Sequence, residues 1–370
     1  MHHFTFAEKD TTIYQASSSL NAGLDEILEV RKDVSDSGNT VNVSRALIRF
    51  DLGYISASMV RNVIKNPRFY LNLYDAGQTA LATSQSLYAY PVSGSWTMGD
   101  GRSYDNPITT EGCSWKYRDG LTEGTLWTHP ALPISSSGAV WISGSGYEAS
   151  HSIGYRTSDV RMDVTDIVNK WLSTNIPNEG FLVKRSGSIG NLSSGSDEGS
   201  KDRLGSLLFF SSDTHTKYPP TLETVWNDSK WSTGSLSPIT GSDLEDSLIY
   251  MKGLRPEYKE NSKVRFRLVC RERFPTKTYS TTPSNLSVKS LPSASSYYSI
   301  KDAETNEVVV PYGSGSYLSC DKNGNYFNLW LSGYQPERYY TIEYRVQSGS
   351  GTDDEIDQYF DEGFTFKVSL

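Results

Sequence analysis

Residues 68–74 of this chain read Arg-Phe-Tyr-Leu-Asn-Leu-Tyr, a segment with the two-residue period of a β-strand. Apolar side chains stand at every second position, at Phe69, Leu71 and Leu73. Successive side chains of a strand point to opposite faces, so this alternation predicts a strand with one buried face. Short segments of the same kind recur between turn residues across the first 226 residues, at 44–52, 86–92, 180–184, 207–210 and 221–226.

One segment has the period of a helix instead. Its apolar residues recur three and four positions apart, Asp163 is a good N-cap, and Pro177 and Gly180 stop the helix. A single short helix against an antiparallel sheet is a common plug for the open end of a sandwich. The expected apolar face consists of Val164, Ile167, Val168, Trp171 and Leu172.

A second β segment begins near residue 247. Val264, Phe266 and Leu268 alternate with charged residues, and 341–346 and 364–368 alternate as well. A length of about 125 residues with roughly seven strands is typical of an immunoglobulin-like sandwich. We therefore expect an all-β protein in two domains, 1–226 and 247–370, joined by a linker at 227–246.

Composition excludes several classes of protein. The chain has 370 residues and a net charge of −8, so we expect neither a nucleic-acid partner nor a basic footprint for one. The sequence contains no long apolar run, so no membrane span is predicted, and its first residues do not resemble a cleaved signal peptide. Three cysteines far apart in the sequence do not make a disulfide framework and favour a reducing compartment.

The N-terminal segments together resemble a known family. They are similar to the disaggregatase-related, carbohydrate-binding-module-like domains, a family of bacterial jelly-roll modules. The resemblance covers roughly residues 1–226 and implies a β-jelly roll and, less strongly, glycan binding. The matching segments are 10–14, 47–52, 88–92, 95–97, 114–120, 163–171, 178–182, 210–216 and 218–220.

The whole chain bears a second resemblance, carried by 250–255, 298–302 and 364–368. It looks like virion structural proteins of T4-like tailed phages of marine bacteria. The resemblance implies a multi-copy neck, collar, tail or capsid-decorating protein, assembled in the host cytoplasm. Its partners would be other virion proteins and copies of itself. This origin would explain a jelly roll of extracellular type without a signal sequence and with reduced cysteines.

Catalytic and metal motifs are not found in the sequence. The five histidines are scattered, and no zinc-ligand spacing, nucleophile elbow or phosphate loop occurs. We therefore expect no catalytic residue, cofactor or metal, although paired glycosidase carboxylates remain open. Asp213 could hold a hard cation with Asp51 or Asp10. The favoured interpretation is that it caps a turn before Pro219.

Aromatic residues are dense in the Gly/Ser-rich stretch 93–155, which is expected to form long surface loops, as is 185–205. Exposed rings there could stack on sugar C–H faces and bind a host surface glycan. The alternative, which we favour, is that the rings anchor the loops or lie in a subunit contact. The glycan-binding candidates are Trp96, Trp115, Tyr117, Trp127 and Trp141.

A row of cations forms a basic ridge near residue 263. It could dock on the acidic surface of a neighbouring subunit, or be a solvated sheet edge that discourages aggregation. Nucleic acid is not favoured, because no aromatic residues interleave on that face. The acidic stretch 353–357 is expected to be solvated surface, and its charge has the sign to meet such a ridge in the next subunit. The docking candidates are Lys263, Arg265, Arg267, Arg271 and Arg273.

The sequence thus predicts a non-enzymatic, two-domain all-β virion protein that acts by docking. An adhesion module that recognises a host surface glycan is the main alternative. A polysaccharide lyase or hydrolase is a third.

Overall fold

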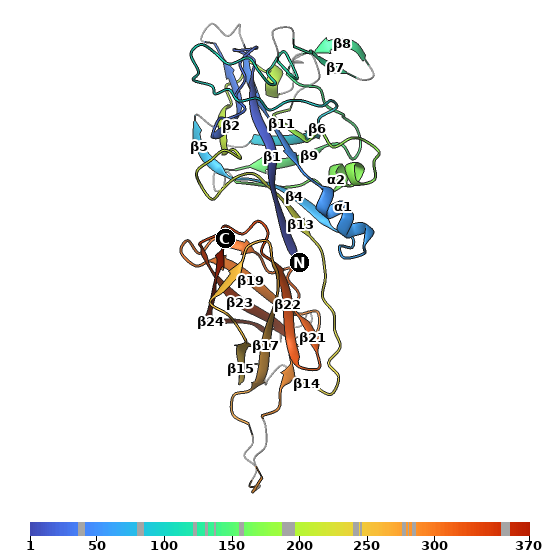
Figure 1. Ribbon diagram of the computed structural model, residues 1–370, viewed down its shortest axis with the longest axis vertical. Coiled ribbons are helices and arrows are strands. Elements are labelled where there is room, and N and C mark those ends of the chain that lie inside the picture. Colours follow the sequence, from blue (N-terminus) through green and yellow to red (C-terminus); the bar gives the residue numbers. More distant parts are fainter. Residues whose placement is uncertain are drawn as a thin grey trace. The chain divides into compact units, whose positions relative to one another are not determined.

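The structure is a computed structural model that divides into two compact units (Figure 1). The N-terminal unit comprises Thr5–Arg61 and Arg68–Glu223, and the C-terminal unit comprises Met1–Phe4, Asn62–Pro67 and Thr224–Leu370. The described residues are 1–35, 41–79, 85–120, 124–129, 132–136, 138–154, 159–186, 197–239, 244, 246–275, 279, 281–282, 286–348 and 356–370.

The units differ from a simple division of the chain into consecutive domains. Met1–Phe4 belong to the C-terminal unit, where the ring of Phe4 meets that of Tyr334 at 6.2 Å. The expected linker 227–246 is also part of that unit. Ile239 and Leu244, which lie in it, are fully enclosed in the apolar core. The expected linker therefore contributes to the core of the C-terminal unit, instead of only connecting the two domains.

Both units are built mainly of strands, as the sequence predicts (Figure 1). The elements that lie wholly or mostly in the N-terminal unit are β1 (His2–Tyr14), β2 (Ile27–Val34), β3 (Val41–Phe50), α1 (Gly53–Val60), β4 (Arg68–Leu73), β5 (Asp75–Thr79), β6 (Gln85–Pro91), β7 (Trp127–His129), β8 (Leu132–Ser136), β9 (Ala149–Ile153), β10 (Val160–Asp163), α2 (Thr165–Leu172), β11 (Phe181–Lys184), η1 (Asp197–Gly199), β12 (Gly205–Phe210) and β13 (Thr221–Val225).

The main sheet of the N-terminal unit has the order β10-β4-β13-β1-β3-β11-β6-β9, and β2, β12 and β5 continue it from β3. β3 pairs with both β1 and β11, so it is a central strand. Its side chains from Val43 to Ile48 are buried on both faces, whereas the alternation at 44–52 suggested one apolar face. At β4 the prediction is confirmed, because Phe69, Leu71 and Leu73 are all buried.

The predicted helix is present as α2, which begins at Thr165. The N-cap is Val164 rather than the expected Asp163, and no side chain caps the helix. The Asp163 carboxylate still accepts a hydrogen bond from the Thr165 backbone N–H, at 3.0 Å. Trp171 of α2 packs edge-on against Phe181 of β11, at 4.6 Å between ring centroids. α1 is an addition to the single expected helix. It buries only Ile55 and Ser58, so it lacks the apolar stripe by which sequence reveals a helix.

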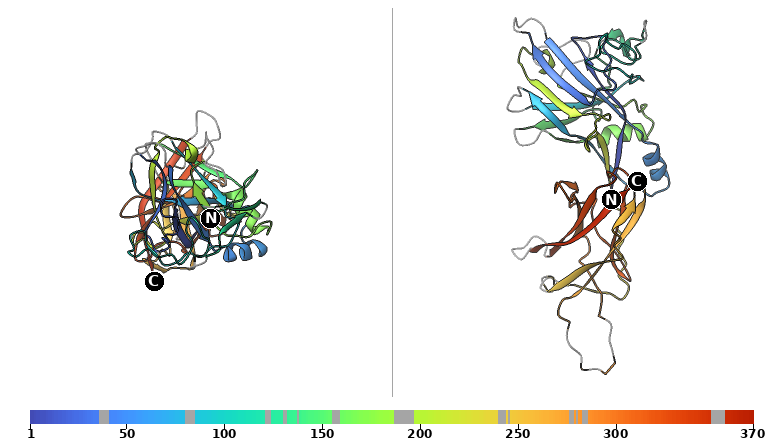
Figure 2. Two further views of the ribbon diagram at one scale, coloured as in Figure 1. Left: turned by 90° about the horizontal axis from the view of Figure 1, so that it is seen from above. Right: turned by 60° about the vertical axis from the view of Figure 1, so that its left-hand side comes forward.

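The C-terminal unit contains two sheets around a common core (Figures 1 and 2). One has the order β14-β18-β17-β22-β21, with β15 also paired to β17; the other has the order β16-β24-β23-β19-β20. The bounds are β14 (Ser237–Pro238), β15 (Ser247–Lys252), β16 (Glu257–Lys259), β17 (Lys263–Glu272), β18 (Lys289–Ser290), β19 (Ser296–Asp302), β20 (Val308–Val310), β21 (Ser319–Asp321), β22 (Gly324–Trp330), β23 (Tyr339–Ser348) and β24 (Ile356–Ser369).

Aromatic rings from both sheets fill that core. Phe266 of β17 stacks on Phe327 of β22 at 5.2 Å, and Phe366 of β24 lies 5.1 Å from Phe266. Tyr298 of β19 stacks on Phe327 at 4.1 Å. Because the two sheets share these contacts, the unit is a β-sandwich whose outward faces lie on opposite sides.

Candidate functional site

The four candidate tryptophans do not form an exposed platform. Trp96, Trp115, Trp127 and Trp141 have relative exposures of 4%, 7%, 1% and 2%, and all belong to one apolar cluster. Two of their indole N–H groups donate to backbone carbonyls, from Trp96 to Glu179 and from Trp127 to Ser114. Little ring surface is left for a sugar, so the glycan-stacking prediction for these four residues is corrected. They anchor the chain segment 93–155, which is the interpretation the sequence favoured.

Tyr117, the fifth candidate, is half-buried rather than enclosed. The Lys116 ammonium lies 5.0 Å from the centre of its ring. Its backbone pairs with Leu126 in an isolated bridge, which ties two loop segments together. The stretch 93–155 also includes β9, which extends the main sheet beside β6, so it is not purely loop.

Asn21 holds this stretch in place, and nothing in the sequence marked it. The side chain is fully buried. Its amide nitrogen donates to the carbonyls of Met98 and Cys113, at 2.7 and 2.8 Å. Its amide oxygen accepts from the backbone N–H groups of Gly23 and Gly101. One side chain thus satisfies four backbone groups that the irregular segment leaves unpaired.

A buried charge cluster lies under the same segment. Glu198 of η1 receives the guanidinium of Arg45, and the Lys184 ammonium lies 3.2 Å from its carboxylate. The Arg45 guanidinium also lies over the rings of Trp115 and Trp141, at 4.9 and 5.2 Å. Burial lowers the pKa of Lys184 to about 8, although Glu198 opposes the shift. All three side chains are buried, so the cluster serves packing.

The proposed cation residues do not form a ligand cage. Asp10 is fully buried and accepts hydrogen bonds from the backbone N–H and the hydroxyl of Ser212, at 2.7 and 2.9 Å. Burial raises the pKa of the Asp10 carboxyl to about 7. Asp51 instead accepts from the Gly53 backbone at the start of α1. No group of three metal-ligating side chains occurs within the part of the chain that the structure describes.

The three cysteines are buried and unpaired with one another. Burial raises the pKa of Cys270 to about 12 and that of Cys320 to about 11, and it raises the pKa of Cys113 as well. These thiols therefore stay protonated near neutral pH.

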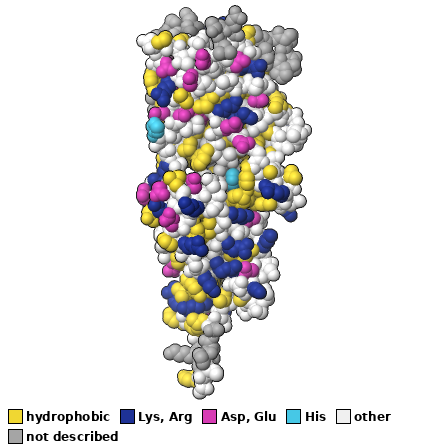
Figure 3. Space-filling model, viewed as in Figure 1, with side chains coloured by type: hydrophobic (Ala, Val, Ile, Leu, Met, Phe, Trp, Pro, Cys, Tyr) yellow, Lys and Arg dark blue, Asp and Glu magenta, His cyan; other side chains and the backbone are white. Residues whose placement is uncertain are grey.

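The basic ridge lies on a central strand. β17 pairs with β22 on one side and with β15 and β18 on the other, so the sheet-edge alternative is wrong. We call the outward side of β15 and β17 the basic face. Dark blue side chains are numerous there in Figure 3, in the region over β17 and β22. Its cations are Lys252, Lys263, Arg265, Arg267 and Arg271.

Aromatic rings do interleave with these cations, contrary to the sequence-based expectation. They come from β22, about 60 residues away in sequence, and register places them beside β17. The Lys263 ammonium lies 4.8 Å from the Trp330 ring, and the Arg265 guanidinium lies 4.4 Å from the Tyr326 ring. Each ring supports a cation from the neighbouring strand, which limits the side chain's freedom before any partner binds.

The cations of the ridge are not equivalent. Arg267 makes a two-pronged ion pair with Asp321 of β21, with both bonds at 2.7 Å. Arg271 donates to the Glu272 backbone carbonyl at 2.8 Å, and Arg273 lies just past the end of β17. Lys263 and Arg265 are exposed and make no ion pair with the described residues. These two carry the charge that remains available to a partner.

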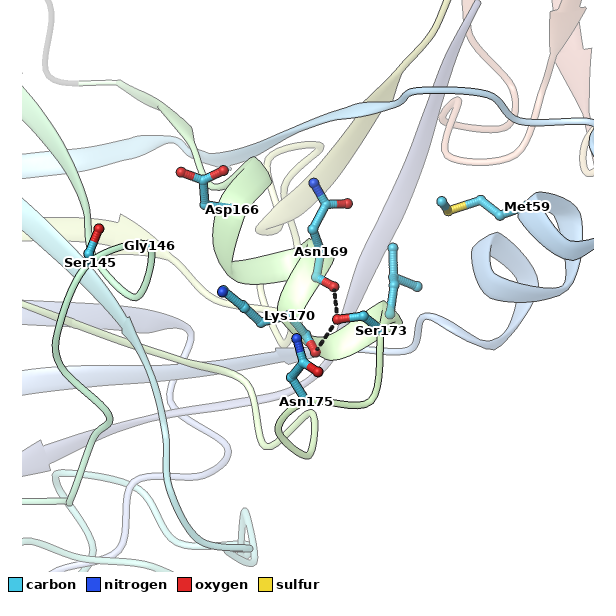
Figure 4. A pocket seen from close by; sticks show the side chains of 9 residues that line it. Met59, Ser145, Gly146, Asp166, Asn169, Lys170, Ser173 and Asn175 are labelled. Atoms are coloured by element: carbon cyan, nitrogen blue, oxygen red, sulfur yellow. Dashed lines mark hydrogen bonds between the residues drawn. The ribbon is translucent and has the colours of Figure 1, made fainter.

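A polar cleft of about 650 Å³ lies beside α2 in the N-terminal unit (Figure 4). Asp166, Asn169 and Lys170 of α2 line it together with Asn175, and Met59 of α1 contributes an apolar side. Gly146 has φ +78°, and a Cβ there would lie 3.6 Å from the Lys170 side chain. That Cβ would make only ordinary contact, so it is the positive φ of this turn that favours glycine. Asp166, Asn169 and Lys170 belong to the segment 163–171 that carries the family resemblance, but no pattern in the sequence singled them out as site residues.

Comparisons with known proteins do not identify a family. No protein-family model matches the chain, and no curated protein matches it. A crystal structure of a Salmonella alpha-2-macroglobulin mutant is similar over all of this chain and 26% of its own, at 9% identity and a TM-score of 0.19. This chain thus spans about a quarter of that protein, and so low a score carries no argument about fold. Among the described residues, no helix has the length and apolar character needed to cross a bilayer.

Proposed function

We propose that this chain is a non-enzymatic structural component of a tailed-phage virion, present in many copies at the neck, collar, tail or capsid surface. It acts by protein docking, with a jelly roll in the N-terminal unit and an immunoglobulin-like sandwich in the C-terminal unit. The sequence resemblance supports the virion origin. The basic face supports the mode of action.

The observation that carries the docking role is the pair Lys263 and Arg265. Both are exposed, lack an ion pair among the residues described, and rest against aromatic rings. Cations already held in place lose little conformational freedom on binding, so they suit an acidic protein surface. Arginine and aromatic side chains are also the residues most enriched where interfaces gain their binding energy.

Particles from the source lysate test this proposal. Immunogold labelling with an antibody to the recombinant chain should place gold at one fixed position on the virion. Particles assembled with Lys263→Glu/Arg265→Glu chains should then lose the label, whereas Arg255→Glu, an exposed cation elsewhere in the same unit, should retain it. Antigen confined to soluble or cell-bound fractions would contradict the virion role. Equal labelling of all variants would contradict docking through the basic face.

Glycan recognition is a second candidate function. The cleft beside α2, rather than the buried tryptophans, would be its site. Amide, carboxylate, ammonium and hydroxyl groups converge there, and such groups fix the orientation of polar ligands. Asn169→Ala/Asn175→Ala should then abolish retention on a host glycan array, whereas Ser56→Ala, outside the cleft, should not. A non-enzymatic role also predicts no rise in reducing ends after incubation with host exopolysaccharide.

A further inference from the structure

The basic face has an acidic counterpart on the other sheet of the same unit. Asp361 and Glu362 of β24 are exposed and make no ion pair with any described residue. Tyr359, two residues before Asp361, is 59% exposed, and Asp357 lies two residues before that. We call Asp357, Tyr359, Asp361 and Glu362 the acidic segment. The acidic stretch 353–357 noted in the sequence lies mostly outside the described residues, and nothing here rests on it.

Cations near the acidic segment are already neutralised within the chain. Arg345 pairs with Asp357 at 2.7 Å, and Lys301 pairs with Glu343 at 2.6 Å. Lys367 is paired with Glu337. On this sheet the carboxylates of Asp361 and Glu362 are thus left over, whereas on the other sheet the cations of Lys263 and Arg265 are left over. The two surpluses have opposite sign.

The fold keeps these two surpluses apart. Phe266 of β17 and Phe366 of β24 meet inside the core, so the outward sides of their sheets face away from each other. A single copy cannot bring Arg265 onto Asp361 without dismantling that core. Two copies can do so without any change in fold.

We propose that the basic face of one copy docks on the acidic segment of a second copy. This inference rests on the docking function proposed above and names the partner. Asp361 and Glu362 are consecutive residues at an irregularity in the pairing of β23 with β24, and both side chains are exposed there. The Tyr359 ring beside them is still 59% exposed, and the Arg345 guanidinium already lies 5.8 Å from its centre.

The contact is heterologous, because it joins two different surfaces. After the first contact one copy keeps a free acidic segment and the other keeps a free basic face, so further copies add head to tail. Such a contact produces a closed ring or an open filament, depending on the rotation between copies. Long-range attraction between charged surfaces also makes the association weaken as salt rises.

Light scattering coupled to size exclusion tests this with the full chain. The wild type should exceed dimer mass at tens of micromolar in low salt and approach 41.2 kDa at high salt. Lys263→Glu/Arg265→Glu and Asp361→Lys/Glu362→Lys should each be monomeric, with self-association weakened at least tenfold. Mixed in equal amounts, the two should restore the higher assembly with the variants in alternation. One variant then carries two acidic surfaces and the other two basic ones, so both kinds of contact join unlike charges. Reversing all four residues in one chain should restore the higher assembly and so controls for folding.

Three results would overturn the inference. The first is a wild type that stays monomeric at every protein and salt concentration. The second is self-association that Asp361→Lys/Glu362→Lys leaves intact, since the acidic surface of the contact would then lie elsewhere. If the basic-face variant leaves virions unlabelled while the acidic variant is incorporated normally, a different virion protein is the partner. That last result removes this inference but preserves the proposed function.

Discussion

Glu198 accepts two hydrogen bonds from the guanidinium of Arg45, at 3.0 Å from Nε and 2.6 Å from Nη2, although 153 residues separate them. Both side chains are almost fully buried, with 3% and 0% exposed. Lys184 lies within 3.2 Å of the same carboxylate, so one anion balances two enclosed cations. The pair joins η1 to β3 and the indole cluster.

Removing the charge of Glu198 should strongly destabilise the N-terminal unit. Glu198→Gln leaves Arg45 and Lys184 buried without a counter-charge, and breaking a buried pair in this way costs about 3–5 kcal/mol. Urea denaturation followed by tryptophan fluorescence would measure the change. Glu111→Gln, at an exposed acid, should change the free energy of unfolding by less than about 0.5 kcal/mol. Equal stability of the two variants would show that the cluster is not structural.

Replacing the amide NH2 of Asn21 by an oxygen should loosen the chain segment 97–120 that this side chain holds. Asn21→Asp replaces the donor of two hydrogen bonds by an oxygen that faces the carbonyls of Met98 and Cys113. An unmet buried acceptor costs about 1–3 kcal/mol, and more when it is charged. Limited proteolysis should then cut within 97–120 at a rate raised at least tenfold, whereas Asn175→Asp should leave the rate unchanged. Resistance equal to the wild type would contradict this role.

The stability of the N-terminal unit should fall as pH rises from about 4 to 7 through Asp10. Burial raises the pKa of its carboxyl to about 7, so in this window the folded chain holds a proton that the unfolded chain has lost. Each pH unit then removes up to about 1.4 kcal/mol. Asp10→Asn cannot titrate, so the wild type should lose stability relative to it as pH rises. Parallel stability curves would refute the assignment.

His3 should act in the opposite direction on the C-terminal unit. Burial lowers its pKa to about 4, and its ring meets that of Trp330 edge-on at 5.8 Å. Between pH 6.5 and 4 the unfolded chain binds a proton that the folded chain does not, so stability falls as pH falls. His3→Asn should flatten this dependence in chemical denaturation measured at several pH values. His3 would be excluded if the stability of the wild type does not fall on the acid side. It would also be excluded if His3→Asn shows the same fall.

Arg265 and Arg267 should contribute unequally to docking. Asp321 already neutralises Arg267, whereas no described acid pairs with Arg265. Arg265→Gln should weaken self-association at least fivefold, and Arg267→Gln less than twofold, as measured by sedimentation at fixed salt. Equal losses would mean that the Arg267–Asp321 pair opens on binding. A partner that depends on Arg267 alone would contradict the assignment of the basic face.

Local pattern was enough for most strands because the pleat of a strand is a local property. The segments at 68–74, 180–184 and 341–346 were all predicted in place. α2 was predicted too, since its apolar stripe lies within one short stretch. The sequence does not predict α1, because that helix has no such stripe. The polar composition of 227–246 predicts a linker, whereas Ile239 and Leu244 from this span lie in a core.

An all-β protein with cations gathered along 263–273 follows from the residues alone. The surroundings of each candidate depend on how the strands pair and pack. Strand pairing placed Trp330 and Tyr326 beside Lys263 and Arg265, and the folding of distant loops enclosed the tryptophans of 93–155. Alternation along one strand shows which side chains share a face, but the strands that pair with it decide whether that face meets solvent, an aromatic ring or a core.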